Sequence, residues 1–187
     1  ADAAGLPVGT VQLIYRTSHT DGERLVSDAR LAAIAYTGSR SAGLKLKAAA
    51  DAVGKPIYVE LSSVNPLVIL PGALKERGEK LVDEFLTSAL MGTGQFCTNP
   101  GLVVLLAGAE SEAFLAAVSK RFEAAPVGAL LSKGVAESLA RGVEVLEQAG
   151  AKVLAGGKPS TAAGFRHTNT LLRATAKQFI AAPHVLQ

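Results

Sequence analysis

The feature that most constrains the fold is an alternation of short apolar runs with longer amphipathic ones. Six short runs, rich in leucine and β-branched residues, predict strands at residues 11–15, 34–36, 57–61, 67–70, 102–106 and 152–154. Four longer runs carry apolar residues at helical spacing and predict helices at about residues 39–52, 74–90, 111–124 and 132–148. This alternation predicts an α/β fold. Several predicted strands lack polar alternation, which predicts helices over both sheet faces.

Local signals refine this division. Ser111 and Ser132 are predicted to cap the starts of the third and fourth helices, and Gly150 is predicted to end the fourth. The stretch "GGKPSTAAGFRHTN", residues 156–169, is typical of an exposed loop. A change of composition at "SSVNP", residues 62–66, predicts a boundary between a first domain, residues 1–62, and a second, residues 63–187.

The composition excludes several classes of function. Of the 187 residues, 49% are hydrophobic and 19% charged, which is typical of a globular protein. The formal net charge is +3, but the basic residues are scattered, so nucleic-acid binding is not expected. The single cysteine excludes an internal disulfide and a multi-cysteine zinc site, and it favours a reducing, cytoplasmic location. No apolar run approaches the ~20 residues of a membrane helix.

That cysteine, Cys97, lies in "GTGQFCTNPG", residues 92–101, between a predicted helix and a predicted strand. A lone cysteine is most often a buried small hydrophobic residue. Here, however, glycines precede it and Pro100 follows, so it is placed in a turn rather than within the apolar run that comes next. Cys97 is therefore a candidate nucleophile, which would need a nearby base or a lowered pKa to act at neutral pH.

Two further stretches suggest a site at the ends of strands. Glu60 stands near the end of the apolar run "PIYVEL", where a carboxylate can serve as a general base or simply face solvent. In "YTGSRSAG", residues 36–43, a strand leads through Gly38 and Ser39 into a helix. The start of a helix suits phosphate groups, although an ordinary capped turn has the same pattern. The three histidines have no partner at metal-ligand spacing and are expected on the surface or in loops; no metal site is predicted.

Taken in order, these stretches resemble the aldehyde dehydrogenase superfamily. "YTGSRSAG" is similar to its F-T-G-S-x-x-x-G cofactor turn, "VELSSVNP" to its glutamate stretch and "GTGQFCTNPG" to its G-Q-x-C signature. The resemblance continues through "GLPVGTVQLI" upstream and "VLEQAGAKVLAGGK" downstream, so it covers nearly the whole chain. It implies that residues 1–62 are the C-terminal part of a Rossmann-like NAD(P)-binding domain. Residues 63–187 would then be part of the catalytic domain.

The resemblance also implies the chemistry. Cys97 would attack an aldehyde, a hydride would pass to NAD or NADP, and Glu60 would activate the water that hydrolyses the resulting thioester. The Cys97 N–H would donate to the oxyanion. Gly38, Ser39 and Gly43 would belong to the cofactor turn, and the Leu61 carbonyl would face the nicotinamide amide.

Within the superfamily, "ELSSVNPLVILPGAL" and "GQFCTNPG" look closest to the α-ketoglutaric semialdehyde (2,5-dioxovalerate) dehydrogenases, with the NADP-dependent fatty aldehyde dehydrogenases second. Ser62 and Ser63 replace the usual Gly-Gly after the glutamate, and Phe96 precedes the cysteine. These departures shift the subgroup but leave both reactive positions in place.

The family chain is much longer than this one, so the resemblance implies an internal fragment. An oxyanion-hole asparagine and a ribose-binding lysine are expected before residue 1. A ribose-binding glutamate and the oligomerisation strands are expected after residue 187. The complete protein is expected to be a homo-oligomer, and the 187 residues alone are expected to be inactive. Two other interpretations remain open from the residues: a hydrolase or acyltransferase that pairs Cys97 with a histidine, and a nonenzymatic α/β module.

Overall fold

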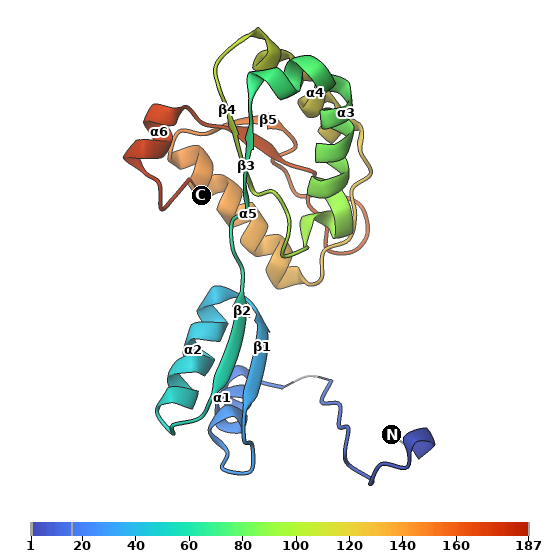
Figure 1. Cartoon of the computed structure of the whole chain (residues 1–187), viewed down its shortest axis with the longest axis vertical. Helices are drawn as coiled ribbons and strands as arrows, with labels where there is room; N and C mark the ends of the chain where they lie inside the picture. Colours follow the sequence, from blue (N-terminus) through green and yellow to red (C-terminus); the bar gives the residue numbers. More distant parts are fainter. Residues whose placement is uncertain (1, 16, 187) are drawn as a thin grey trace. The chain divides into compact units, whose positions relative to one another are not determined.

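The computed structural model describes residues 2–15 and 17–186, and the chain divides into two compact units, Ala1–Ser62 and Ser63–Gln187. The prediction of an α/β fold is confirmed, because parallel strand pairs joined by helices occur in both units (Figure 1). The assignment of the units to cofactor and catalytic domains stays a prediction. Over the described residues, no helix combines the length and apolarity that crossing a membrane requires.

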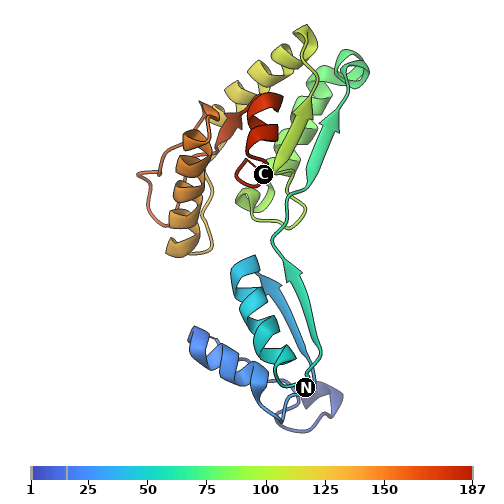
Figure 2. The ribbon, with the colours of Figure 1, turned by 90° about the vertical axis from the view of Figure 1, so that its left-hand side faces the viewer.

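The first unit is a strand–helix–strand motif preceded by one helix. Its elements are the 3₁₀ turn η1 (Asp2–Ala4), α1 (His19–Ser27), β1 (Ile34–Gly38), α2 (Arg40–Asp51) and β2 (Ile57–Leu61). The two strands pair in parallel, from Ile34 opposite Ile57 to Gly38 opposite Leu61. Helix α2 packs on one face of this pair and α1 packs on α2, as Figure 2 shows.

Within the described part of the first unit, helices cover one face of this strand pair, whereas the sequence predicts helices over both faces. Along each strand, half-buried residues alternate with exposed ones. The half-buried side chains of Ile57, Val59 and Leu61 alternate with the exposed side chains of Tyr58 and Glu60. The uncovered face therefore carries the candidate base.

The strand predicted at residues 11–15 is wrong. These residues pair with no strand among the residues that the structure describes, and their apolar side chains are exposed, from 65% for Ile14 to 95% for Tyr15. An apolar run becomes a strand only where a partner can satisfy its backbone N–H and C=O groups. In the first unit β1 and β2 pair with each other, and residues 11–15 pair with neither strand.

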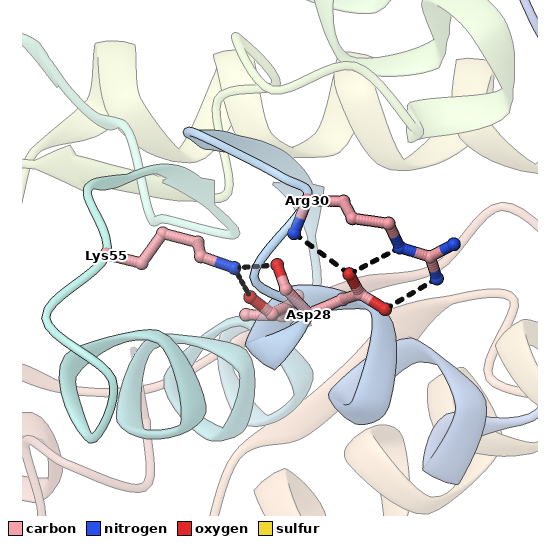
Figure 3. A network of polar contacts seen from close by, with 4 residues as sticks. Asp28, Arg30 and Lys55 are labelled. Carbon is pink, nitrogen blue, oxygen red and sulfur yellow. Dashed lines mark hydrogen bonds and ion pairs between the residues drawn. The ribbon is translucent and has the colours of Figure 1, made fainter.

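A polar network links the end of α1 to Lys55, in the segment between α2 and β2 (Figure 3). Lys55 Nζ donates to the carbonyls of Val26, at 2.9 Å, and Asp28 at the end of α1. The Asp28 carboxylate accepts bonds from the Arg30 side chain at 2.9 and 2.7 Å and from the Arg30 backbone N–H at 3.0 Å. The Arg30 side-chain bonds are the main reason that the pKa of Asp28 lies well below its ordinary value.

The second unit begins with another parallel pair, and its elements are β3 (Pro66–Ile69), α3 (Pro71–Leu90), the 3₁₀ turn η2 (Met91–Gly94), β4 (Leu102–Leu105) and α4 (Ala109–Ala124). Its core lies where α3 and α4 pack together. The Phe85 ring centre is 6.2 Å from that of Phe114 and 6.0 Å from that of Phe122, and Val118 is 1% exposed. Buried aromatic rings at such spacings stabilise a core beyond their area alone.

The chain then continues through α5 (Lys133–Gln148), β5 (Lys152–Ala155), β6 (Leu171–Arg173) and α6 (Ala176–Ala181), with β5 and β6 antiparallel. Ser132 caps α5 as predicted, because its Oγ accepts from the Val135 N–H. The predicted cap at Ser111 is wrong. Helix α4 starts after Gly108, and the buried Ser111 hydroxyl donates to the Leu106 carbonyl at 2.6 Å.

Candidate active site

Cys97 lies on an exposed turn that follows α3 and η2. The Asn99 N–H donates to the Phe96 carbonyl at 3.1 Å, so Cys97 and Thr98 occupy the two central positions of a four-residue turn. Exposure leaves the thiol within reach of a solute, as a nucleophile requires. Within its own unit, Cys97 is therefore outside the buried core.

Three successive residues with left-handed backbone lead from α3 into this turn. Their φ angles are 57° at Gly92, 61° at Thr93 and 72° at Gly94. Such angles suit glycine, but a β-branched threonine is strained in this region. A Cβ at Gly92 would also lie 2.5 Å from the Phe96 ring. Gly92 and Gly94 therefore allow the left-handed backbone that leads into the Cys97 turn.

Three side-chain amides tie the Cys97 turn to distant segments. Asn65 Nδ2 donates to the carbonyls of Cys97 and Asn99 at 2.8 and 2.9 Å. Asn99 Nδ2 donates to the Ala89 carbonyl at 2.7 Å, near the end of α3. Gln95 accepts from the Leu131 N–H at 2.9 Å and donates to the Ala129 carbonyl at 3.3 Å. The turn and the residue before it are thus bonded to three other segments, although the turn is exposed.

An open hollow of about 530 Å³ lies beside the turn. Met91 and the two neighbours of the cysteine, Phe96 and Thr98, line its loop side, and residues of α3 line the rest.

Glu60 lies in the first unit, one residue before the end of β2, opposite Thr37 of β1. Its side chain is on the uncovered face of the strand pair and exposed. Ligands in open α/β sheets bind outside the carboxyl ends of strands, which is where Glu60 lies. A carboxylate there is accessible to water and can accept a proton.

Of the four predicted cofactor-binding residues, Gly38 and Ser39 form the β1–α2 turn, Gly43 lies in α2 and Leu61 ends β2. Ser39 is exposed and caps α2, its Oγ accepting from the Ala42 N–H at 3.4 Å. Ser62 Oγ accepts from the Arg40 N–H at 3.3 Å, so a residue beyond β2 also contributes to the start of the helix. The twelve-residue α2 presents the positive end of its dipole here, which is suited to an anionic group.

Gly43 and Leu61 meet inside the first unit. A Cβ at Gly43 would overlap the Leu61 side chain and come within 3.0 Å of the Tyr36 ring. Gly43 is buried, so its observed contribution is the close packing of α2 on β2. Gly38 lies beneath the same tyrosine, because a Cβ there would overlap the Tyr36 hydroxyl.

The structure thus gathers five predicted site residues, Gly38, Ser39, Gly43, Glu60 and Leu61, in the β1–α2–β2 motif, and it places Cys97 in the second unit. Within residues 2–15 and 17–186, no group of three or more His, Cys, Asp or Glu side chains is arranged to hold a metal ion.

The histidines lie on the surface or in loops, as expected, but one of them is buried. His19 and His184 are exposed, whereas His167 lies in the loop and is 3% exposed. An isolated antiparallel bridge pairs Pro159 with His167 within this loop. Its Nδ1 lies 3.0 Å from the Thr168 carbonyl, while Nε2 is buried without a hydrogen-bond partner among the described residues.

The sequence reasoning missed the amide contacts of the Cys97 turn. Asn65 stands in "SSVNP", which was interpreted only as a boundary, and Asn99 and Gln95 flank Cys97 in the motif. A signal was available, because asparagine beside a glycine- and proline-rich turn commonly bonds to backbone groups. That signal does not identify the partners, which here lie up to 36 residues away.

Comparison with known proteins agrees with this arrangement. The profile of the aldehyde dehydrogenase family matches residues 1–183. Alpha-ketoglutaric semialdehyde dehydrogenase 2 of Azospirillum brasilense is 37% identical over 140 residues, covering 74% of this chain and 27% of the relative. Alpha-ketoglutaric semialdehyde dehydrogenase of Acinetobacter baylyi is 34% identical over 158 residues, covering 83% of this chain and 30% of the relative. The chain thus spans less than a third of the length of either protein.

Among solved structures, succinic semialdehyde dehydrogenase from Streptococcus pyogenes, in complex with NADP⁺, matches with a TM-score of 0.79. The match has 21% sequence identity and covers 94% of this chain and 40% of that chain. At this identity the likeness shows the fold, which is part of the aldehyde dehydrogenase fold. The family profile, the two relatives and the fold agree: the chain belongs to the aldehyde dehydrogenase family.

Proposed function

We propose that this chain carries the nucleophile and the general base of an NAD- or NADP-dependent aldehyde dehydrogenase. The observation that carries the proposal is the exposed thiol of Cys97 on a turn fixed by three side-chain amides, in a chain that matches the family over residues 1–183. An exposed cysteine held in this way is organised for reaction rather than for packing.

In the first half-reaction the Cys97 thiolate attacks the aldehyde carbonyl carbon. A C–S bond forms, and the carbonyl oxygen becomes an oxyanion that the Cys97 N–H stabilises. When bound, NAD or NADP accepts the hydride that leaves this carbon. Loss of that hydride restores the carbonyl and leaves Cys97 joined to the acyl group as a thioester.

In the second half-reaction Glu60 removes a proton from water, and the resulting hydroxide attacks the thioester carbon. The C–S bond breaks, Cys97 departs as a thiolate and the product is a carboxylic acid. The exposed position of Glu60 at the end of β2 supports this role, because the base must meet both water and the acyl group.

The residues of the β1–α2 turn fit a dinucleotide. Ser39 is exposed at the start of α2, where the helix dipole favours the negative charge of a pyrophosphate. Gly38 and Ser39 would hold that group, and the Leu61 carbonyl would accept from the carboxamide of the nicotinamide. Gly43 supports the turn by letting α2 pack closely on β2.

For the substrate we propose α-ketoglutaric semialdehyde (2,5-dioxovalerate), oxidised to 2-oxoglutarate. Two relatives with that name are 37% and 34% identical to this chain over 140 and 158 residues, and this identity supports the proposal. We further propose that the protein of natural length works as a cytoplasmic homo-oligomer, as the family resemblance implies.

The test is a comparison of kcat/KM for 2,5-dioxovalerate and for a long-chain aldehyde, with NAD and with NADP, on the protein of natural length. A preference for 2,5-dioxovalerate supports the proposed substrate. A preference for the long chain would assign the protein to the fatty aldehyde enzymes, and no aldehyde-dependent cofactor reduction would reject the proposed function. The 187-residue chain assayed alone is expected to be inactive.

A further inference from the structure

We propose that Asn65 is a positioning residue that fixes the backbone of the nucleophile turn, an inference that rests on the proposed function of Cys97. One amide group bridges two carbonyls of this turn, Cys97 O at 2.8 Å and Asn99 O at 2.9 Å. Both bonds come from Nδ2, which has two N–H groups, so both donors are used. Asn65 is itself half-buried, whereas Cys97 is exposed.

The Cys97 carbonyl is the part of the turn most in need of a tether. It belongs to the peptide between Cys97 and Thr98, which is the central peptide of the turn closed by Asn99 N–H and Phe96 O. The common turn types differ by rotation of this central peptide, and the closing bond permits both orientations. The bond from Asn65 selects one, and in doing so it sets ψ of Cys97 and φ of Thr98.

The second bond of Asn65 anchors the exit of the turn. The Asn99 carbonyl accepts from Asn65 Nδ2 and also from the Gly101 N–H at 2.9 Å. The Asn99 side chain is in turn bonded to the Ala89 carbonyl at 2.7 Å. Asn65 thus bonds to the Cys97 backbone carbonyl and to Asn99, whose side chain is in turn bonded to α3.

Asn65 also belongs to the stretch "VELSSVNP" that carries Glu60. The stretch therefore supplies two groups with separate roles, a carboxylate for the proton transfer and an amide for the turn. Since the amide is neutral, it orients the backbone beside Cys97 without adding net charge next to the thiol.

The chain offers a matched control in Asn169. Its Nδ2 donates to the carbonyls of Phe122, Ala125 and Pro126 at 3.4, 3.1 and 3.3 Å, and it is half-buried like Asn65. Asn169→Ala therefore removes the same kind of contact in the same unit, but it leaves the Cys97 turn intact. Asn65→Asp serves as a second variant, because it keeps the shape of the side chain and removes both donors.

The first measurement is amide hydrogen exchange in the 187-residue chain. In Asn65→Ala and in Asn65→Asp, exchange at Asn99 and Gly101 should accelerate at least about tenfold relative to amides of β5, since two neutral hydrogen bonds to the turn are lost. In Asn169→Ala these two amides should keep their wild-type rates relative to β5. Equal acceleration in the Asn65 and Asn169 variants would show a general loss of stability and overturn the proposal.

The second measurement is turnover by the protein of natural length. Asn65→Ala should lower kcat by about 10- to 100-fold with a smaller change in KM, because a misplaced nucleophile loses alignment rather than binding. Asn169→Ala should keep wild-type kcat, and wild-type kcat in Asn65→Ala would overturn the positioning role. If the wild-type protein oxidises no aldehyde, the proposed function fails, while the exchange measurement still decides whether Asn65 fixes the turn.

Discussion

Each unit contains a side chain that bridges two carbonyls, two residues apart, in a distant segment. In the first unit Lys55 Nζ bonds to the carbonyls of Val26 and Asp28, and in the second Asn65 Nδ2 bonds to those of Cys97 and Asn99. The geometry is shared but the chemistry differs. Lys55 brings a positive charge to the end of α1, where the negative end of a helix dipole and Asp28 favour it. Asn65 brings none.

The two bridged segments therefore differ in their electrostatic surroundings. The end of a helix gains stability from a cation. A cation fixed beside a cysteine would instead alter its reactivity, since nearby positive charge lowers a thiol pKa. The amide of Asn65 bonds to the turn without bringing a charge to it. Stability and reactivity can therefore be perturbed separately in the two units.

The largest expected effect is chemical and lies in the second unit. Cys97→Ser should reduce aldehyde-dependent formation of NADH or NADPH by the protein of natural length at least about 10³-fold, because a serine hydroxyl without a base is a poor nucleophile. Thermal unfolding should change little, since the side chain is exposed. Wild-type turnover in this variant would refute the assignment.

Glu60→Gln is the corresponding change in the first unit. Removing a general base should slow steady-state turnover by ~10²–10⁴-fold. The thioester should still form, so a rapid burst of reduced cofactor should precede the slow phase. Stopped-flow measurement of that burst separates a role in hydrolysis from a role in the first half-reaction. A variant without a burst would place Glu60 in the earlier step.

Much of the framework could be predicted from the sequence, because its determinants are local. The 57–61 strand is found with its predicted bounds, the helix predicted at 132–148 is found at Lys133–Gln148, and the cap at Ser132 is confirmed. In the helix, residue spacing and the capping group are local signals, whereas the strand also has β1 as a partner. The exposed turn around Cys97 follows in the same way from its glycines.

What escaped prediction depends on distant partners. Residues 11–15 look like a strand but lack a strand partner among the described residues, and His167 is buried although it lies in a loop. Asn65 acts on carbonyls 32 and 34 residues away. A local sequence pattern does not predict these contacts, because they depend on how the elements pack.

In the first unit, α2 packs closely on β2 at Gly43. Gly43→Ala should lower the free energy of unfolding by about 1–3 kcal/mol, because the new methyl group would overlap Leu61. Gly22→Ala in α1 is the matched control. Nothing lies within 4 Å of its new methyl group, so it should stabilise by about 0.5–1 kcal/mol. Denaturant unfolding measures both, and equal signs would contradict the packing argument.

The Lys55 bridge is expected to matter less than the packing at Gly43. Lys55→Met should cost about 1–2 kcal/mol of unfolding free energy, since the half-buried ammonium group makes two charge-assisted hydrogen bonds. Lys47→Met, which removes only an exposed pair with Asp51, should cost about 0.3–0.5 kcal/mol. Neither variant should change the exchange of the Cys97 turn, whereas Asn65→Ala should change it strongly. Faster exchange of the Cys97 turn in Lys55→Met would contradict the independence of the two bridges.

The smallest effect expected concerns the carboxylate beside Lys55. Hydrogen bonds from the Arg30 side chain, supported by the Arg30 backbone N–H, hold the pKa of Asp28 below its ordinary value of 3.8. Because the pKa is lower in the folded state, the folded protein binds this proton less readily than the unfolded chain does. The resulting stability is present above about pH 4 and is lost as the pH falls through and below that value.

Arg30→Ala removes the main cause of the shift, so wild type should be slightly more stable than the variant at neutral pH, and the difference should shrink in acid. Chemical unfolding at a series of pH values measures it. Arg24→Ala is the control, because the Arg24 guanidinium lies 3.9 Å from Asp21 in a more exposed pair, and its loss should leave the acid side of the curve unchanged. Since the Asp28 pair is near solvent, salt should reduce the Arg30 effect. A difference that grew as the pH fell would reverse the sign of the linkage and reject this interpretation of Asp28.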